Sequence, residues 1–146
     1  MSTKRTGEPW MPPDEYGRSL PQFTVNLVVT NIERALGFYR NVMGAKVVYS
    51  DADFAALRLE NWEFMIHADH AYDRHPWHER LGRGDKRGLG AELRLLGTDP
   101  DLVESRAKQH GAKILQTAQD KPHGWRDVIV EDHDGYAWAV GVATPR

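Results

Sequence analysis

Residues 44–48 read "GAKVV" and residues 111–115 read "GAKIL", two versions of one short segment. A match of five residues is weak alone, so the neighbouring segments must correspond as well. Both stretches are preceded by apolar residues at helical spacing and followed by a short apolar strand. A glycine directly after a helix is typical of the left-handed residue that ends it. The sequence therefore predicts that one structural unit occurs twice.

The helices expected before Gly44 and Gly111 both have recognisable start signals. Thr30 and Glu33 fit a capping box at the first helix. Residues 98–100 offer a capping side chain and a first-turn proline to the second helix. The first helix has the fuller apolar stripe, made of Ile32, Leu36, Tyr39 and Met43. The second has a thinner one, made of Val103 and Ala107.

A strand of alternating character is expected before each helix, over residues 23–29 and 89–96. Two hairpins follow the helices, one turning at Glu60-Asn61 and the other at Asp134-Gly135. Each half is therefore strand–helix–strand–strand–strand, and the fold class is α+β with paired βαβββ modules that form a concave mixed-sheet cleft. The expected parts are a flexible N-terminal arm at 1–21, a first module at 22–68, an inter-module loop at 69–87 and a second module at 88–142.

The composition narrows the function classes. A formal net charge of −2 does not suggest a nucleic-acid binder, and the absence of cysteine excludes disulfides and thiolate chemistry. No apolar run approaches the roughly 18 residues of a membrane span, and residues 1–22 lack the apolar region of a secretory signal. We therefore expect a cytoplasmic protein with no nucleic-acid or membrane partner. Trp10 and Tyr16 are expected to pin the arm to the body or to a partner subunit.

Two segments, "FTVNLVVTNIERALGFYRNVMGAKVV" and "KPHGWRDVIVEDHDGYAWAVG", give the chain a family resemblance. The sequence resembles the vicinal oxygen chelate superfamily, also called the glyoxalase, bleomycin-resistance and extradiol-dioxygenase superfamily. "ALGFYRNVMG" and "EDHDGYAW" are similar to its FYxxxLG and DPDG patterns, with His133 in place of the proline. The resemblance spans about residues 22–142. It implies paired βαβββ modules, commonly a dimer, and a ligand cleft inside the sheet.

The resemblance also implies positions for a divalent metal, which many members hold with His and Glu. Carried over residue by residue, these positions fall on Thr24, Met65, Ala139 and Glu92, or on Ala91 if the register slips by one. Thr, Met and Ala are not competent ligands for such a metal, and one carboxylate cannot hold it alone. We therefore expect no cofactor and no metal in the cleft.

Four histidines crowd into the segment "HADHAYDRHPWHE": His67, His70, His75 and His78. One interpretation is a divalent metal site separate from the cleft. The other is a solvated linker, because no standard zinc spacing is present and polar stretches this long are usually functional or flexible loops. His67 differs in ending a strand on the face of Glu63 and Met65. Glu63 and His67, with Glu92, are candidate acid–base residues, and the alternative is that His67 caps the strand.

Candidate ligand contacts lie on the polar faces of the expected strands, at Thr24, Asn26, Glu92 and Arg94. Glu92 and Arg94 either clamp a zwitterionic or amide-bearing ligand or neutralise each other across a dimer seam. Trp125 either stacks on a flat ligand at the mouth of the cleft or covers the edge of the core.

The function expected from these features is metal-independent binding of a small antibiotic-like or aromatic molecule in the cleft of a homodimer, as in resistance proteins that sequester drugs. One alternative is an enzyme of the same superfamily: a dioxygenase, lyase or isomerase with a rearranged metal site, or a metal-free Glu/His acid–base catalyst. Another is a structural or partner-binding module. Fold alone does not decide among these classes.

Overall fold

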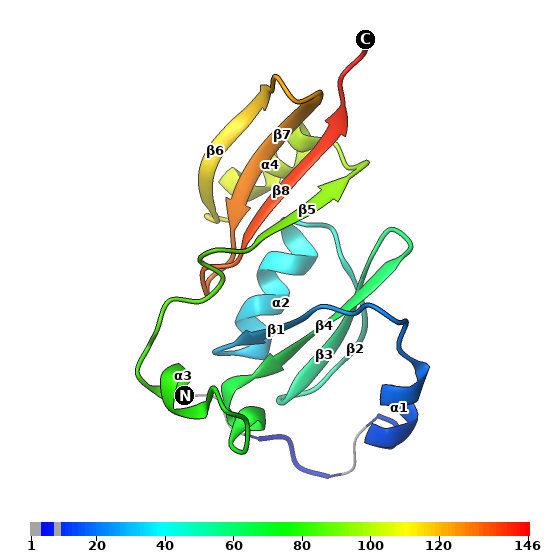
Figure 1. Ribbon diagram of the computed structural model, residues 1–146, viewed down its shortest axis with the longest axis vertical. Helices are drawn as coiled ribbons and strands as arrows, with labels where there is room; N and C mark the ends of the chain where they lie inside the picture. Colours follow the sequence, from blue (N-terminus) through cyan, green and yellow to red (C-terminus); the bar gives the residue numbers. More distant parts are fainter. Residues whose placement is uncertain (1–3, 8–9) are drawn as a thin grey trace. The chain divides into compact units, whose positions relative to one another are not determined.

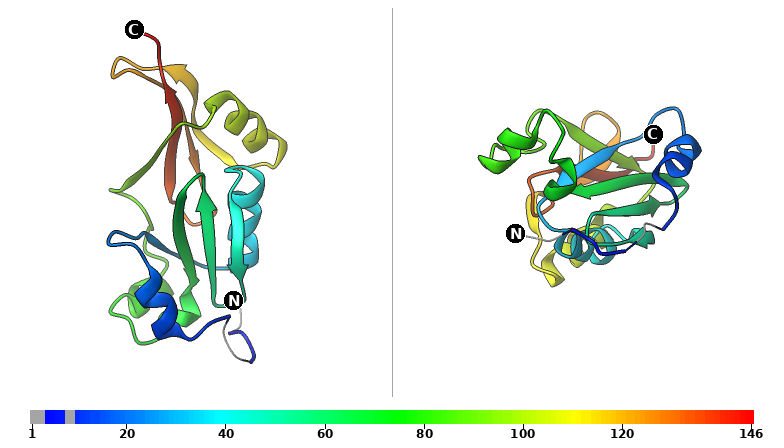
Figure 2. Two further views of the ribbon diagram at one scale, coloured as in Figure 1. Left: turned by 90° about the vertical axis from the view of Figure 1, so that its right-hand side faces the viewer. Right: turned by 90° about the horizontal axis from the view of Figure 1, so that it is seen from below.

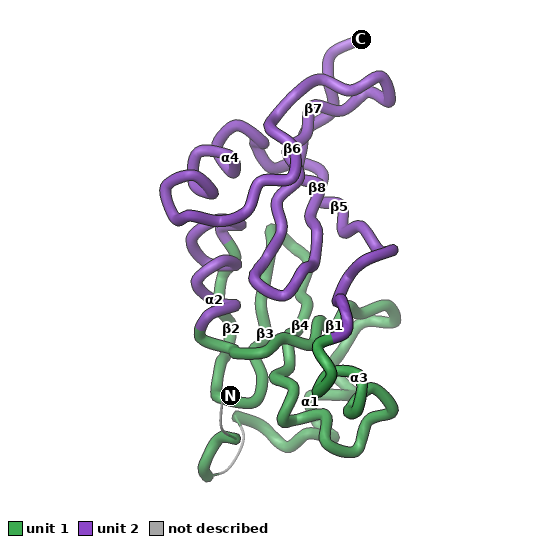
Figure 3. Tube along the Cα trace, turned by 90° about the vertical axis from the view of Figure 1, so that its left-hand side faces the viewer, with its two compact units in different colours: residues 1–33, 45–84 green, residues 34–44, 85–146 purple. Residues whose placement is uncertain are grey.

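The computed structural model describes residues 4–7 and 10–146 and divides them into two compact units (Figure 3). Unit 1 contains residues up to 33 together with 45–84, and unit 2 contains residues 34–44 together with 85–146. The division does not follow sequence order, because residues 34–44 group with the second unit. The module limits expected from the sequence remain a prediction, as does the shared cleft.

Unit 1 is built on a four-stranded mixed sheet in the order β1-β4-β3-β2. Its strands are β1 (Asn26–Val29), β2 (Lys46–Ser50), β3 (Phe54–Leu59) and β4 (Trp62–Ala68). β1 is parallel to β4, whereas the other neighbours are antiparallel. β3 and β4 are joined by the hairpin expected at Glu60-Asn61, where Glu60 has a positive φ of 54°. Three short helices flank this sheet in the chain: α1 (Pro13–Ser19), η1 (Asp69–Tyr72) and α3 (His78–Gly82).

Unit 2 repeats this topology. Its strands are β5 (Glu92–Leu96), β6 (Lys113–Asp120), β7 (Trp125–Glu131) and β8 (Ala137–Ala143), in the order β5-β8-β7-β6. β5 is parallel to β8, as β1 is to β4. Helix α4 (Pro100–Gln109) lies along one face of this sheet, which Figures 1 and 2 show from three directions. The duplicated α+β architecture predicted from the two "GAK" segments is thereby confirmed.

The ends of the two main helices follow the signals in the sequence. Helix α2 (Ile32–Asn41) is followed by Gly44 with φ 75°, and α4 is followed by Gly111 with φ 69°. Only a residue without a Cβ adopts this left-handed conformation at little cost. Asp99 caps α4 by accepting a hydrogen bond from the backbone N–H of Asp101. Two strand starts were predicted wrongly. β1 begins at Asn26 and β5 at Glu92, whereas Phe23 and Leu89, expected inside these strands, are 75% and 83% exposed.

The core of unit 2 lies between its sheet and its helices. One face of β7 and β8 carries buried apolar side chains, in register with one another: Val128 with Val140 and Val130 with Trp138. Val103 and Ala107 of α4 are fully buried. Burial of such side chains stabilises a fold by roughly 1.5–3 kcal/mol each. None of the helices among the described residues has both the length and the hydropathy that a membrane span requires.

Tyr39 of α2 connects the two sequence motifs inside unit 2. Its hydroxyl donates a hydrogen bond to Oδ2 of Asp132 over 2.7 Å, and the indole N–H of Trp138 donates to the Tyr39 oxygen over 3.2 Å. Both Tyr39 and Trp138 are almost completely buried, and Asp132 is 5% exposed. Burial raises the pKa of Tyr39 well above its ordinary value, so its hydroxyl stays protonated and remains a donor.

Replacing Tyr39 by Phe should lower the free energy of unfolding by about 1–3 kcal/mol, because a buried carboxylate oxygen loses its donor. Urea denaturation of Tyr39→Phe, of Asp132→Asn and of the double variant measures the coupling between the two side chains. Purely additive effects of the two substitutions would contradict this role for the hydrogen bond.

Gly141 in β8 is expected to tolerate no side chain. A Cβ built there lies 2.2 Å from the carbonyl oxygen of Arg126 and 2.8 Å from the Cβ of Asp127. Gly141→Ala should therefore lower the free energy of unfolding by about 1–3 kcal/mol, the usual cost of overpacking. Gly37→Ala is the matched control, since a Cβ at Gly37 in α2 meets nothing within 4 Å. The control should gain about 0.5–1 kcal/mol from helix propensity. Equal unfolding midpoints for both variants would disprove the steric argument.

Candidate functional site

One face of the first sheet carries the side chains from which the sequence predicted a site. Strand register pairs Asn26 with Met65, and places Phe54 opposite His67. Since alternate residues of a strand share a face, Glu63, Met65 and His67 lie on the same side of β4. The opposite face holds the fully buried Phe64 and Ile66.

A cavity of about 420 Å³ opens on this polar face of unit 1, beneath the described part of the N-terminal arm. Aromatic side chains form much of its wall. Trp10 stacks on Tyr49 with 5.0 Å between ring centroids, and Tyr16 of α1 presents an edge to Phe54 at 5.2 Å. Trp10 and Tyr16 thus hold the arm against the body of their own chain, which is one of the two alternatives expected from the sequence. Residues 1–3 and 8–9 of the arm lie outside the described residues.

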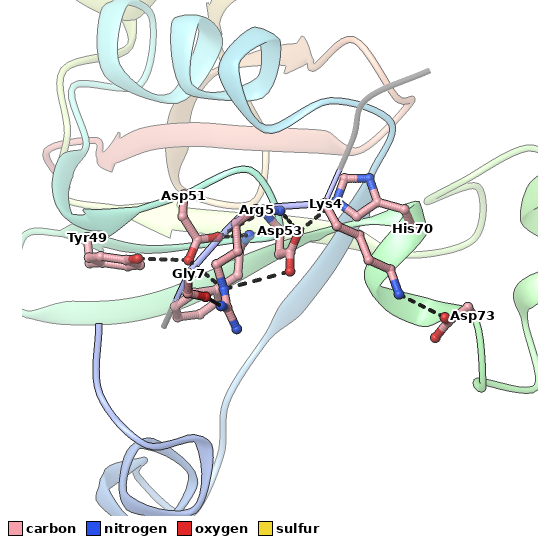
Figure 4. A network of polar contacts seen from close by, with 9 residues as sticks. Lys4, Arg5, Gly7, Tyr49, Asp51, Asp53, His70 and Asp73 are labelled. Atoms are coloured by element: carbon pink, nitrogen blue, oxygen red, sulfur yellow. Dashed lines mark hydrogen bonds and ion pairs between the residues drawn. The ribbon is translucent and has the colours of Figure 1, made fainter. Parts of the chain in front are cut away.

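A pair of carboxylates lies at one side of the cavity and faces Arg5 (Figure 4). The Arg5 Nε is 3.3 Å from Oδ2 of Asp51 and 3.8 Å from Oδ2 of Asp53. The backbone N–H of Arg5 also donates to Oδ1 of Asp53 over 2.7 Å. The Tyr49 hydroxyl donates to Oδ2 of Asp51 over 2.8 Å, which raises the pKa of Tyr49. Nε2 of His70 completes the network at 2.9 Å from Oδ1 of Asp53.

His67 also lines the cavity and is held by Asn26. Its Nδ1 is 2.8 Å from Oδ1 of Asn26, whose Nδ2 in turn donates to the hydroxyl of Tyr72. With the amide oxygen as acceptor, Nδ1 carries the proton, and Nε2 has no hydrogen-bond partner among the residues that the structure describes. Burial lowers the pKa of His67, although Asp51 and Asp53 act in the opposite direction. The ring is therefore neutral at pH 7.

The structure does not join Glu63 to His67. The Glu63 carboxylate pairs with Arg58 at 3.2 Å, on the neighbouring strand. Glu63 instead acts on Tyr16, whose pKa is raised to about 12 by burial and secondarily by this negative charge. Within the described part of the chain, the Tyr16 hydroxyl is the buried side-chain polar atom that lacks a hydrogen-bond partner. A neutral hydroxyl at the wall of a cavity is thus available to a ligand.

Unit 2 brings together Glu92, Arg94 and Trp125, as the sequence suggested. The Arg94 guanidinium lies over the Trp125 ring, with 4.5 Å from Cζ to the centroid, and donates to Oε1 of Glu92 over 2.7 Å. Its second terminal nitrogen is 3.1 Å from Nε2 of His123. Arg94 thus covers the face of Trp125 that was expected to receive a flat ligand, and Glu92 neutralises Arg94 within one chain.

Beside this cluster lies Asp127, a buried carboxylate that the sequence analysis overlooked. It is 1% exposed, and Lys121 Nζ lies 3.0 Å from its Oδ1. Gln116 donates to the same oxygen over 3.4 Å, and His123 lies 3.7 Å from the other oxygen. Oδ1 of this buried carboxylate is therefore paired with the Lys121 cation, which compensates the buried charge.

The side chains at the positions implied for a family metal are unsuited to bind a metal or are already paired. Thr24 donates its hydroxyl to the backbone oxygen of Pro21, Met65 is 8% exposed, and Ala139 is buried. The remaining carboxylate, Glu92, is bound to Arg94. In residues 4–7 and 10–146, no three His, Asp or Glu side chains come together in a group that could hold a metal ion.

The four clustered histidines do not share one set of contacts. His67 binds Asn26 and His70 binds Asp53. His75 stacks on Tyr72 at 4.6 Å between centroids and accepts a hydrogen bond from the backbone N–H of Trp77. His78 begins α3 and is exposed. Each of the first three thus has its own partner, which fits the loop interpretation of this segment better than a shared metal site.

Sequence reasoning missed the acidic part of the cavity. Asp51 accepts hydrogen bonds from the backbone N–H groups of Asp53 and Phe54, so it shapes the turn between β2 and β3. The signal available in the sequence was the segment "SDADF", in which Asp is a typical turn residue. The segment does not reveal that Arg5, far away in the chain, pairs with these carboxylates.

Many solved structures share the fold, and three of them illustrate the similarity. A glyoxalase-related enzyme from Fulvimarina pelagi is 19% identical, with 84% of this chain and 88% of that chain covered and a TM-score of 0.67. TioX from Micromonospora sp. ML1 is 22% identical, with 85% and 99% covered and a TM-score of 0.61. Lactoylglutathione lyase from Agrobacterium tumefaciens is 15% identical, with 84% and 94% covered and a TM-score of 0.60.

None of the curated proteins has a sequence that matches this chain significantly. The model of one protein family, described as the Glyoxalase/Bleomycin resistance protein/Dioxygenase superfamily, matches residues 21–140. This match contains the segments "ALGFYRNVMG" and "EDHDGYAW" and most of both repeated units of secondary structure. The chain therefore belongs to the glyoxalase/bleomycin resistance protein/dioxygenase superfamily.

Proposed function

We propose that this protein binds a small, partly aromatic molecule, without a metal, in the cavity of unit 1. The observation that carries this proposal is the wall of that cavity, which combines Trp10, Tyr16, Tyr49 and Phe54 with a few polar groups around about 420 Å³. Ligand sites typically have this size, a mainly apolar lining and a small number of placed polar side chains. An antibiotic to be sequestered or an aromatic metabolite would fit this description.

Two larger cavities fit such a ligand less well. One of about 780 Å³ in unit 1 is lined by charged side chains beside α3 and by no aromatic carbocycle. Another of about 630 Å³ in unit 2 is formed mainly by loop residues around Gly88 and Gly135, with Phe38 as its aromatic side chain. Neither offers several aromatic rings on which a flat molecule can stack.

The proposal of metal independence rests on the side chains at the family's ligand positions. Thr24, Met65 and Ala139 offer neither imidazole nor carboxylate. Some proteins with a similar fold have names that denote enzymes. Binding without catalysis is therefore not taken from them and is proposed from the residues of this chain. A cytoplasmic homodimer is proposed by analogy with the family.

Trp10→Ala should weaken binding of an aromatic ligand about tenfold, since an aromatic pair contributes roughly 0.5–1.5 kcal/mol beyond its buried area. Trp77→Ala is the matched control, because Trp77 is 48% exposed and does not line the cavity. A thermal-shift screen identifies the ligand, and calorimetric titration with and without a chelator measures its affinity.

Two results would refute the proposed site or its metal independence. If Trp125→Ala abolishes binding while Trp10→Ala leaves it unchanged, the ligand binds at the Arg94–Trp125 cluster instead. If chelator removes binding and one added metal per chain restores it, the protein depends on a metal.

The second candidate function is metal-free acid–base catalysis at His67. The observation that favours it is the neutral ring at the cavity wall, oriented by Asn26 with Nε2 as its unprotonated nitrogen. A lactoylglutathione lyase shares this fold, which is an analogy for an isomerase or lyase. Proton abstraction would need Nε2, whereas Nδ1 is used for positioning.

The ring of His67 should titrate below its ordinary pKa of about 6.5. A folded-state pKa below the unfolded one makes the unfolded chain bind more protons, so this contribution to stability is present above pH 6.5 and is lost as the pH falls through the folded pKa. Ring ¹⁵N chemical shifts measure the titration, and Asn26→Ala should increase the Nε2–H tautomer. A pKa at or above 6.5 would contradict the burial argument, and an unchanged tautomer would contradict the role of Asn26.

A further inference from the structure

The guanidinium group of Arg5 is a cation of the protein itself that lines the cavity of unit 1. Arg5 is 26% exposed at its side chain and lies against Asp51 and Asp53, which are 13% and 21% exposed (Figure 4). All three side chains line the same cavity as the aromatic rings. Exposed ion pairs contribute little, but pairs at this degree of burial are screened less by solvent and salt.

The aromatic rings and the carboxylates are joined rather than merely adjacent. Tyr49 stacks on Trp10 and donates its hydroxyl to Asp51, so one side chain connects the aromatic wall to the acidic pair. Phe54 follows Asp53 in the chain and lies 6.0 Å from Tyr49 between centroids. Aromatic faces and carboxylates both attract positive charge, and their combination is how proteins recognise organic cations.

We propose that the natural ligand of this cavity is an organic cation: a protonated or quaternary amine, or a guanidinium, on a flat apolar body. This inference rests on the proposed function and names its ligand class. Arg5 then occupies the cation position in the protein without ligand, and the ligand's positive group replaces it between Asp51 and Asp53.

The charge balance of the cavity argues for a cation over a neutral molecule. Displacing Arg5 by a neutral ligand would leave the carboxylates of Asp51 and Asp53, which both lie near its Nε, without this cation, and His70 is bound to only one of them. Like charges held close together are costly when solvent is excluded. A cationic ligand restores the original balance, and its apolar body gains contact with Trp10 and Tyr49.

The test compares two probes of one shape and different charge, 1-naphthylmethylamine and 1-naphthylmethanol, by calorimetric titration at pH 7 on the full chain. Unaltered protein should bind the amine at least tenfold more tightly than the alcohol. Arg5→Ala should increase the affinity for the amine severalfold, because the competing guanidinium is gone. Asp53→Asn, which preserves shape, should reduce the preference for the amine toward unity. Raising the salt concentration should reduce it as well.

The control variant is Lys4→Ala, which removes a neighbouring cation that pairs with Asp73 at 2.9 Å rather than with the carboxylates of this cavity. It should leave the ratio of the two affinities unchanged. Circular dichroism confirms folding, and Asp51→Asn provides a second carboxylate variant if Asp53→Asn fails to fold.

The outcomes separate this inference from the proposed function. If the alcohol binds as tightly as the amine and Trp10→Ala weakens both, the aromatic cavity is a ligand site and the cation proposal is wrong. If the amine preference persists in both carboxylate variants, the cation proposal is also wrong. If neither probe binds and the screen finds no ligand sensitive to Trp10→Ala, both proposals fail together.

Discussion

The hydrogen bond from Tyr39 to Asp132 is the contact on which the arrangement of unit 2 depends. It joins α2, from the first half of the chain, to the turn between β7 and β8. Oδ1 of Asp132 also accepts from the backbone N–H groups of Asp134 and Tyr136, so one carboxylate orders the turn and holds the helix. Burial raises the pKa of this carboxyl group, while its donors act in the opposite direction. A buried carboxylate is tolerated here because both oxygens are satisfied.

The cavity of unit 1 follows from a different physical balance. A strand face that carries Asn26, Glu63 and His67 is too polar to pack tightly against an apolar layer. The described part of the arm lines the cavity on this face with the aromatic rings of Trp10 and Tyr16 and with Arg5. Rings fill space without demanding many partners, and the arginine satisfies the acidic turn. The result is a covered but incompletely filled face, which is what a small ligand needs.

Much of the fold could be predicted because its signals are local. The capping residue Asp99, the left-handed Gly44 and Gly111, and the alternation along β4 each reflect a backbone requirement within a few residues. The repeated strand order then follows from repeating these signals. β1 and β5 were each predicted three residues too long, because alternation continues back to Phe23 and Leu89 although neither residue is paired in its sheet.

The sites were harder to predict because their partners are far apart in sequence. Nothing near Arg5 indicates that it binds Asp51, and nothing near Tyr39 indicates Asp132, 93 residues later. The expected Glu63–His67 pair shows that residues close in sequence can also fail to pair. The two residues share a strand face, yet each takes a partner from a neighbouring strand, Arg58 and Asn26. Spacing along one strand identifies a face but not which pairs form on it.

The interleaved division of the chain has a consequence for synthesis on the ribosome. Residues 34–44 belong to unit 2, whose remaining residues begin at 85. At roughly 5–20 residues per second, Tyr39 is synthesised about 5–20 s before Asp132. During that interval the apolar side of α2 has no access to its final partners, among them Trp138. The nascent chain therefore carries an amphipathic helix whose partners in unit 2 are not yet synthesised, and exposed apolar segments of this kind are bound by chaperones. A chain that terminates before unit 2 is complete would never gain these contacts.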